Sequence, residues 1–226
     1  MNKNMMEYRY RIVHSFYYFS NAIMDEYYNC CMHNMVNDLS VEEIEGIMNT
    51  KWKGFVNYRC DEHDMSPLLA AVFSGRVDMV ELFLRYGAEL ERAILQEAAG
   101  SIPYSGDRSA IAKIITLLAS KGADVNEEDA FEQVPLSACI TREAADALIN
   151  AGADVNKANE NYGCTPLHYA IMRKKKDVVK ALIERGADLY IPDKKGETAF
   201  DMLLRKAFDK KGNPKDDEDS DEEDEE

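Results

Sequence analysis

Long hydrophobic runs are missing from this sequence, which contains no apolar stretch of about 18 residues that could cross a bilayer. The apolar run 12–19 follows basic residues, as in a secretory signal, but polar residues interrupt it and no small-x-small cleavage site precedes Asp25. Cysteine is scarce: the five residues are an odd number without disulfide-like spacing, which favours a reducing compartment. We therefore expect a soluble cytoplasmic protein, with the nucleus as an alternative.

An excess of positive charge is also absent, since the formal net charge is −15. Much of this charge lies in residues 216–226, where ten carboxylates accompany a single other residue, Ser220. Phosphate binding requires a compensating positive field, so nucleic-acid binding is disfavoured. Like charges at this density repel one another and offer nothing to bury, which predicts a disordered acidic tail over 208–226.

Catalytic and metal-binding motifs are absent as well. The sequence has no Gly-x-Ser-x-Gly, no phosphate-binding glycine loop and no His-Glu-x-x-His. The close Cys/His pairs are Cys31 with His33 and Cys60 with His63, whereas structural zinc usually requires two such pairs at defined spacings. We expect no catalytic residues, no metal site and no cofactor.

The sequence does contain an internal repeat. A phrase of the form Gly-Ala-acidic-apolar recurs at intervals of 35, 30 and 34 residues, beginning at Gly87, Gly122, Gly152 and Gly186. Each glycine follows an amphipathic segment, where a helix C-terminus favours a residue with positive φ. A second phrase, with proline in second place, begins at Ser66, Val134 and Thr165. A hydroxyl ahead of proline is typical of a helix N-terminus.

Apolar residues at three- and four-residue spacing predict helices between these two phrases. The segments are 77–84, 111–118, 144–149 and 178–183, with a further helix over 93–99. Upstream, Ser40 and Glu43 form the pattern of a capping box, which predicts a helix over 41–48. One helix pair cannot cover its own apolar face, so neighbouring pairs must stack.

These motifs resemble ankyrin repeats, and Thr165 to Ala170 matches the Thr-Pro-Leu-His-x-Ala signature of that family in full. The resemblance covers about residues 40–206 and implies an all-α solenoid of helix-turn-helix units with short β-hairpin-like turns. It also implies that His168 forms hydrogen bonds within and between neighbouring turns, a structural role.

The resemblance divides the chain into a capping segment, a repeat domain and a tail. We predict an N-terminal helical capping segment over 1–36, with a partner-binding helix that exposes an aromatic face as the alternative. The predicted repeat domain spans 37–207 and comprises a partial repeat 37–60, repeats 61–90, 91–125, 126–155 and 156–189, and a terminal partial repeat 190–207. We number these the first to fourth repeats and the terminal repeat.

In the family, partners usually bind along the concave side, on turn tips and first helices. This implies a candidate partner-binding set: Phe73, Phe131, Tyr162, Tyr169, Met172 and Arg173. Phe131 and Tyr162 have the alternative of folding back onto a neighbouring turn. Residues 127–132 contain four acidic residues, which favours a basic or mixed partner surface. The basic cluster 173–176 is either a solvated loop or a docking point for an acidic partner or for the tail.

The sequence and the resemblance together predict a monomeric, non-catalytic interaction module that acts as an adaptor, scaffold or inhibitor of another protein. The alternative is a polyanionic binder or chaperone of basic proteins that acts through the acidic tail. A third hypothesis, an enzyme with its site in residues 1–36, has little fold available to form a pocket.

Overall fold

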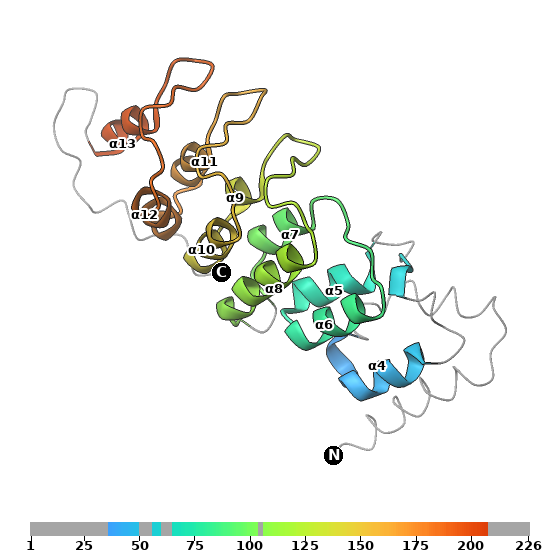
Figure 1. Cartoon of the computed structure of the whole chain (residues 1–226). Coiled ribbons are helices and arrows are strands. Elements are labelled where there is room, and N and C mark those ends of the chain that lie inside the picture. The colour runs from blue at the N-terminus through green and yellow to red at the C-terminus, as the bar shows by residue number, and fades with distance from the viewer. Residues whose placement is uncertain (1–35, 50–55, 60–64, 104–105, 208–226) are drawn as a thin grey trace. The chain divides into compact units, whose positions relative to one another are not determined.

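A computed structural model describes residues 36–49, 56–59, 65–103 and 106–207 (Figure 1). The predicted capping segment, the acidic tail and both Cys/His pairs lie outside the described residues. The chain divides into two compact units, Met1–Glu89 and Leu90–Glu226, and each is described by itself.

The N-terminal unit contains the helices α4 (Val41–Met48), α5 (Pro67–Ser74) and α6 (Val77–Arg85). Helix α4 begins with the predicted capping box: the Ser40 N–H donates to Glu43 Oε2 at 2.8 Å, and the Glu43 N–H donates to Ser40 Oγ at 3.2 Å. The Leu69 N–H likewise donates to Ser66 Oγ at 3.1 Å at the start of α5. These side chains satisfy backbone donors that have no partner within the helix.

The C-terminal unit is built from two rows of helices (Figure 1). One row packs in the order α7 (Ile94–Gly100), α9 (Pro135–Ala138), α11 (Pro166–Met172) and α13 (Ala199–Ala207). The other row packs in the order α8 (Arg108–Ser120), α10 (Arg142–Asn150) and α12 (Lys176–Glu184). The described residues contain no regular strand, only an isolated antiparallel bridge between Pro192 and Thr198, so the predicted all-α class is confirmed.

Several helices extend by one to three residues beyond the predicted segments, and two of the differences have a local reason. Helix α8 is longer than predicted because Asp107 caps it, its Oδ1 accepting from the Ser109 N–H at 2.9 Å. Helix α7 begins one residue later than predicted because Ala93 has a φ of 63°, in the left-handed region. In the segment predicted as the third repeat, α9 has four residues, and Thr141 Oγ1 accepts from the Ala144 N–H to cap α10.

The core of the C-terminal unit lies between the two rows. Ile111, Ile114, Ile115 and Leu118 on α8 are buried, as are Leu148 on α10 and Leu182 on α12. Full burial of one such side chain contributes roughly 1.5 to 3 kcal/mol. This apolar layer holds the helices in place and leaves their connecting loops at the surface. Within the described ranges, no helix is long and apolar enough to cross a membrane.

Candidate functional site

Three loops project side by side from the C-terminal unit, ahead of α9, α11 and α13 (Figure 1). We call their ends tip three (129–133), tip four (159–163) and tip five (193–197). In tip three, Asp129 Oδ1 accepts hydrogen bonds from the N–H groups of Phe131 at 2.8 Å and Gln133 at 2.9 Å. The Asp129 N–H closes the loop by donating to the Gln133 carbonyl at 3.1 Å.

The other two tips close in a similar way. Asn159 Oδ1 accepts from the Tyr162 N–H at 2.6 Å in tip four. Asp193 Oδ1 accepts from the N–H groups of Lys195 at 2.8 Å and Glu197 at 2.9 Å in tip five. The bond from Glu197 and, to a lesser degree, that from Lys195 stabilise the carboxylate and hold the pKa of Asp193 below its ordinary value. One Asx side chain therefore organises each tip.

The tips are also connected to one another. Asn159 Nδ2 donates to the carbonyl oxygens of Phe131 at 3.4 Å and Glu132 at 3.3 Å, which joins tip four to tip three. The Lys194 N–H donates to the Tyr162 carbonyl at 2.8 Å, which joins tip five to tip four. A Cβ on Gly163 would lie 3.0 Å from the Lys194 nitrogen, so this close approach requires glycine. The hydrogen bonds hold the three tips as one preorganised row.

A second series of contacts connects the repeats at the bases of the loops. Asn126 Oδ1 accepts from the Asp154 N–H at 2.8 Å, and Asn156 Oδ1 accepts from the Asp188 N–H at 2.8 Å. The recurring asparagine of the Gly-Ala-Asp-Val-Asn phrase thus holds the same phrase of the following repeat.

The structural role predicted for His168 is confirmed. His168 is fully buried, and its Nδ1 accepts from the Thr165 N–H at 3.1 Å. Its Nε2 lies 3.3 Å from the Glu197 carbonyl oxygen, in tip five. In the second repeat Gln96 makes a comparable contact to the following loop, with Nε2 donating to the carbonyl oxygens of Glu127 at 2.8 Å and Gln133 at 3.1 Å. Sequence reasoning missed Gln96, although it lies three residues after Ala93 as His168 lies three after Thr165.

The two predicted aromatic tip residues point into solvent. Phe131 is 74% exposed on tip three and Tyr162 is 62% exposed on tip four, so neither ring is buried against a neighbouring turn. Because hydrogen bonds join the two tips, the backbones that carry these rings have a defined separation. Met172, at the end of α11, is 50% exposed. This arrangement presents apolar side chains on a rigid surface.

Tyr169 and Arg173 lie together behind the tips. The Arg173 guanidinium lies 5.5 Å from the centre of the Tyr169 ring and donates to the Ser137 carbonyl at 2.8 Å and to Gln133 Oε1 at 2.9 Å. Partial burial is the main cause that raises the pKa of Tyr169. Arg173 therefore connects the fourth repeat to the third, a contact that the sequence did not predict. Phe73 is half-buried on α5, in the other unit.

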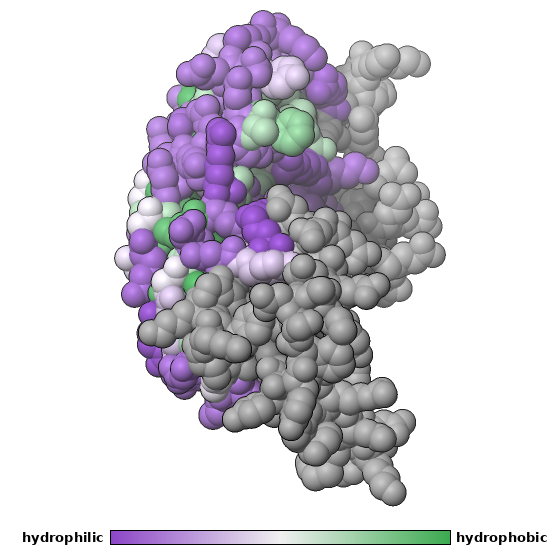
Figure 2. Space-filling view, turned by 90° about the vertical axis from the view of Figure 1, so that its right-hand side faces the viewer, coloured by the Kyte–Doolittle hydropathy of each residue, from purple (hydrophilic) through white to green (hydrophobic). Residues whose placement is uncertain are grey.

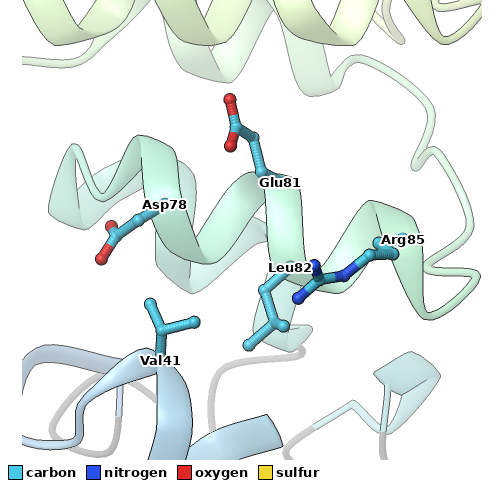
Figure 3. Close-up of a pocket in the computed structure, with 5 residues that line it drawn as sticks. All are labelled: Val41, Asp78, Glu81, Leu82 and Arg85. Carbon is cyan, nitrogen blue, oxygen red and sulfur yellow. The ribbon is translucent and has the colours of Figure 1, made fainter.

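A pocket in the N-terminal unit is a weaker candidate for a binding site than the tips (Figure 3). This depression of about 290 Å³ is lined by Val41 of α4 and by residues of α6, with Val41 and Leu82 pointing toward each other. Two of its charged groups have partners, because Asp78 pairs with Arg76 at 2.6 Å and Arg85 with Glu45 at 3.0 Å. Within the part of the chain that the structure describes, no three His, Cys, Asp or Glu side chains are placed to hold a metal ion.

On the face drawn in Figure 2, the described residues are largely hydrophilic. Figure 2 shows one face on which the described apolar residues gather only in small groups among polar ones. Such a face offers separate anchor residues to a partner instead of one broad apolar patch.

Comparison with known proteins agrees with the repeat pattern. A model of three ankyrin repeat copies matches residues 105–193, and a single ankyrin repeat model matches 63–95. The chain is 33% identical over 147 residues to an ankyrin repeat-containing protein of Treponema pallidum, covering 63% of this chain and 47% of that one.

Two further relatives are eukaryotic. Human ankyrin repeat and SOCS box protein 16 is 33% identical over 143 residues, which cover 60% of this chain and 30% of the human one. Palmitoyltransferase AKR1 of Candida albicans is 43% identical over 56 residues, which cover 25% of this chain and 7% of that enzyme. This chain thus spans less than half the length of these curated relatives. The repeat architecture and the family matches lead to one conclusion: the chain belongs to the ankyrin repeat family, whose repeats generally serve protein interaction.

Proposed function

We propose that this protein is a non-catalytic interaction module that binds a partner protein through the tips and first helices of its ankyrin repeats. It would act as an adaptor, a scaffold or an inhibitor. The observation that carries the proposal is the exposure of Phe131 and Tyr162 on adjacent tips that are hydrogen-bonded to each other.

Rigid exposed aromatic residues suit this function for an energetic reason. Binding loses free energy to the ordering of mobile side chains and loops, and a preorganised surface avoids much of that cost. Aromatic side chains have few rotatable bonds and bury a large area, so they commonly dominate binding energy at interfaces. The backbone bonds from Asn159 and Lys194 restrict the tips before any partner arrives.

The remaining candidate residues extend the proposed surface. Met172 supplies an exposed flexible apolar side chain next to Arg173, and half-exposed Tyr169 lies beneath the guanidinium. We assign Arg173 a mixed role, since its bonds to the third repeat also support the fold. Phe73 stays in the proposed set as a residue of the first repeat, on the α5 helix.

The test is affinity capture with quantitative mass spectrometry in cells of the native host. We would compare the natural chain with a Phe131→Ser/Tyr162→Ser variant and a matched Tyr190→Ser control, whose ring is 66% exposed outside the tips. We expect the double variant to lose specific partners that the control retains. Equal capture by all three chains would rule out the tips as the binding surface.

The second candidate function rests on the ten carboxylates in residues 216–226, which would attract basic proteins. Changing these residues to Asn and Gln in the full chain should then abolish capture. Capture should also weaken steeply with added salt, because exposed charges are screened. Capture that survives neutralisation of the tail would reject this alternative and leave the repeat surface as the binding site.

A further inference from the structure

We propose that tips three and four bind an extended, arginine-bearing segment of the partner protein. This inference rests on the proposed function and specifies the chemistry of the partner. It follows from three features of the described C-terminal unit: a pair of exposed rings, a group of carboxylates without basic partners, and a strained backbone at one of those carboxylates.

The rings of Phe131 and Tyr162 lie on successive tips, so a segment that touches both must run along the row of tips. An extended chain satisfies this requirement. A guanidinium is planar and weakly hydrated, and it stacks on the face of an aromatic ring. The chain itself contains one such pair, Arg173 over Tyr169 at 5.5 Å.

The charges around the rings are mainly negative, although the Arg173 guanidinium contacts tip three through Gln133 Oε1 at 2.9 Å. Of the four carboxylates in tip three and just before it, Glu128 pairs with Lys157 at 3.0 Å and Glu127 lies 3.9 Å from Arg92. The other two, Asp129 and Glu132, have no basic side chain within ion-pair distance in the described part of this unit, and neither has Glu160 of tip four. A partner segment that brings positive charge would complement them, and guanidinium binds carboxylate through paired hydrogen bonds.

Glu132 carries the third feature. Its φ is 58°, whereas glycine occupies the corresponding positions of tips four and five, Gly163 with a φ of 70° and Gly196 with a φ of 82°. A left-handed conformation is unfavourable for a residue with a Cβ, and such strain persists most often where function requires the side chain. In addition, Glu132 Oε2 is shielded from water without a hydrogen-bond partner among the described residues. Rotation of the Glu132 side chain toward solvent would expose this oxygen, and a guanidinium would then offer it several donors.

Tip five differs in charge. Its exposed Lys194 and Lys195 balance the carboxylates of Asp193 and Glu197, so this tip adds no net negative charge for a basic segment. The negative charge that favours arginine is therefore concentrated at tips three and four. Lysine fits this site less well, because a compact ammonium is not planar and so cannot stack flat on a ring or pair with a carboxylate through two parallel hydrogen bonds.

The test uses the full chain and three short fluorescein-labelled peptides that alternate leucine with arginine, lysine or glutamate. Fluorescence anisotropy at physiological ionic strength measures each dissociation constant. We expect the arginine peptide to bind about tenfold more tightly than the lysine peptide, a difference of about 1.4 kcal/mol. The reason is that a guanidinium stacks flat on a ring and pairs with a carboxylate through two hydrogen bonds, which an ammonium cannot do. The double variant Phe131→Ser/Tyr162→Ser should raise the dissociation constant of the arginine peptide by a similar factor. The double variant Glu132→Gln/Glu160→Gln should do the same.

Two control variants remove competing explanations. Lys194→Gln/Lys195→Gln should leave binding unchanged or slightly stronger, and neutralisation of residues 216–226 should leave the preference for arginine over lysine intact. Circular dichroism would show that each variant keeps its helices. Equal binding of the arginine and lysine peptides, no binding of the arginine peptide, or binding that depends on the tail alone would overturn the inference.

The outcome separates this inference from the proposed function. If the tip variants lose native partners but the tips prefer the glutamate peptide, the surface is an interaction site and the assigned chemistry is wrong. If the tip variants change neither peptide binding nor the capture of native partners, both proposals fail together.

Discussion

Asn156 Oδ1 accepts a hydrogen bond from the backbone N–H of Asp188 at 2.8 Å, so a side chain of one repeat holds the turn of the next. Asn126 does the same for Asp154, also at 2.8 Å. In the terminal repeat Tyr190 takes the corresponding position and packs against Phe200 in a tilted arrangement, with the ring centroids 5.4 Å apart. The residue that would hold a following turn is thus replaced by an aromatic one.

We predict that Asn156→Ala lowers the free energy of unfolding by about 1 kcal/mol, the net contribution of a typical hydrogen bond. Urea denaturation followed by circular dichroism measures the change. Tyr190→Asn is the matched control, because it restores the asparagine where the chain presents no following phrase of this kind. The control also removes the ring contact with Phe200, so some loss of stability from that contact is expected. If Asn156→Ala leaves the free energy of unfolding unchanged, the interrepeat role of this side chain is contradicted.

His168→Ala should cost about 2 to 4 kcal/mol, because it removes a fully buried side chain and leaves the Thr165 N–H without its acceptor. His168→Gln should recover part of this loss, since Gln96 shows that a glutamine at this position can donate to the carbonyl oxygens of the following loop. The same denaturation experiment applies. If His168→Gln loses as much stability as His168→Ala, positions 96 and 168 correspond in place but not in function.

Glu132→Gly should stabilise the chain by about 1 kcal/mol, because glycine adopts the left-handed conformation without strain. The same change should weaken binding of the arginine peptide, because it removes the carboxylate. Lys174→Gly is the control, as Lys174 also has a φ of 58° but lies in the loop between α11 and α12. We expect it to increase stability without any effect on the peptide. If the Glu132→Gly variant binds the arginine peptide as tightly as the natural chain, the strained conformation of Glu132 is not explained by a need for its side chain in binding.

The Asp193 carboxylate should make stability depend on pH. Its pKa in the folded state is lowered from 3.8, so its contribution is present above that value and is lost as pH falls through the folded pKa. Asp193→Asn should keep the turn, because Asn159 organises tip four with an amide, and should flatten the acid limb of the stability profile. Denaturation midpoints between neutral pH and about pH 3 would show the difference. An unchanged acid limb would assign the loss of stability to other carboxylates.

Arg173→Ala should lower stability by about 1 to 2 kcal/mol, because it removes hydrogen bonds from a charged donor to the third repeat. Arg173→Lys should recover little, since one ammonium does not reproduce bonds to both the Ser137 carbonyl and Gln133 Oε1. A variant of unchanged stability that nevertheless loses partner binding would make Arg173 a binding residue only.

Much of the fold was predictable from short motifs. The capping box at Ser40 and Glu43, the hydroxyl before Pro67 and the role of His168 follow from local patterns, and the structure confirms them. The start of α7 was off by one residue because the left-handed conformation of Ala93 has no signature in a non-glycine residue. Gln96 was missed because its partners, the carbonyl oxygens of Glu127 and Gln133, lie more than thirty residues away in sequence.

The sequence by itself determined the repeating helical architecture and the acidic character of tip three. Periodic apolar residues, glycines at helix ends and local charge are properties of adjacent residues, which need no tertiary information. Only the tertiary structure decided that Phe131 and Tyr162 remain exposed on tips joined by Asn159, and that Arg173 is engaged by the third repeat. These features depend on how loops some thirty residues apart approach each other, and the packing of successive helices sets that distance.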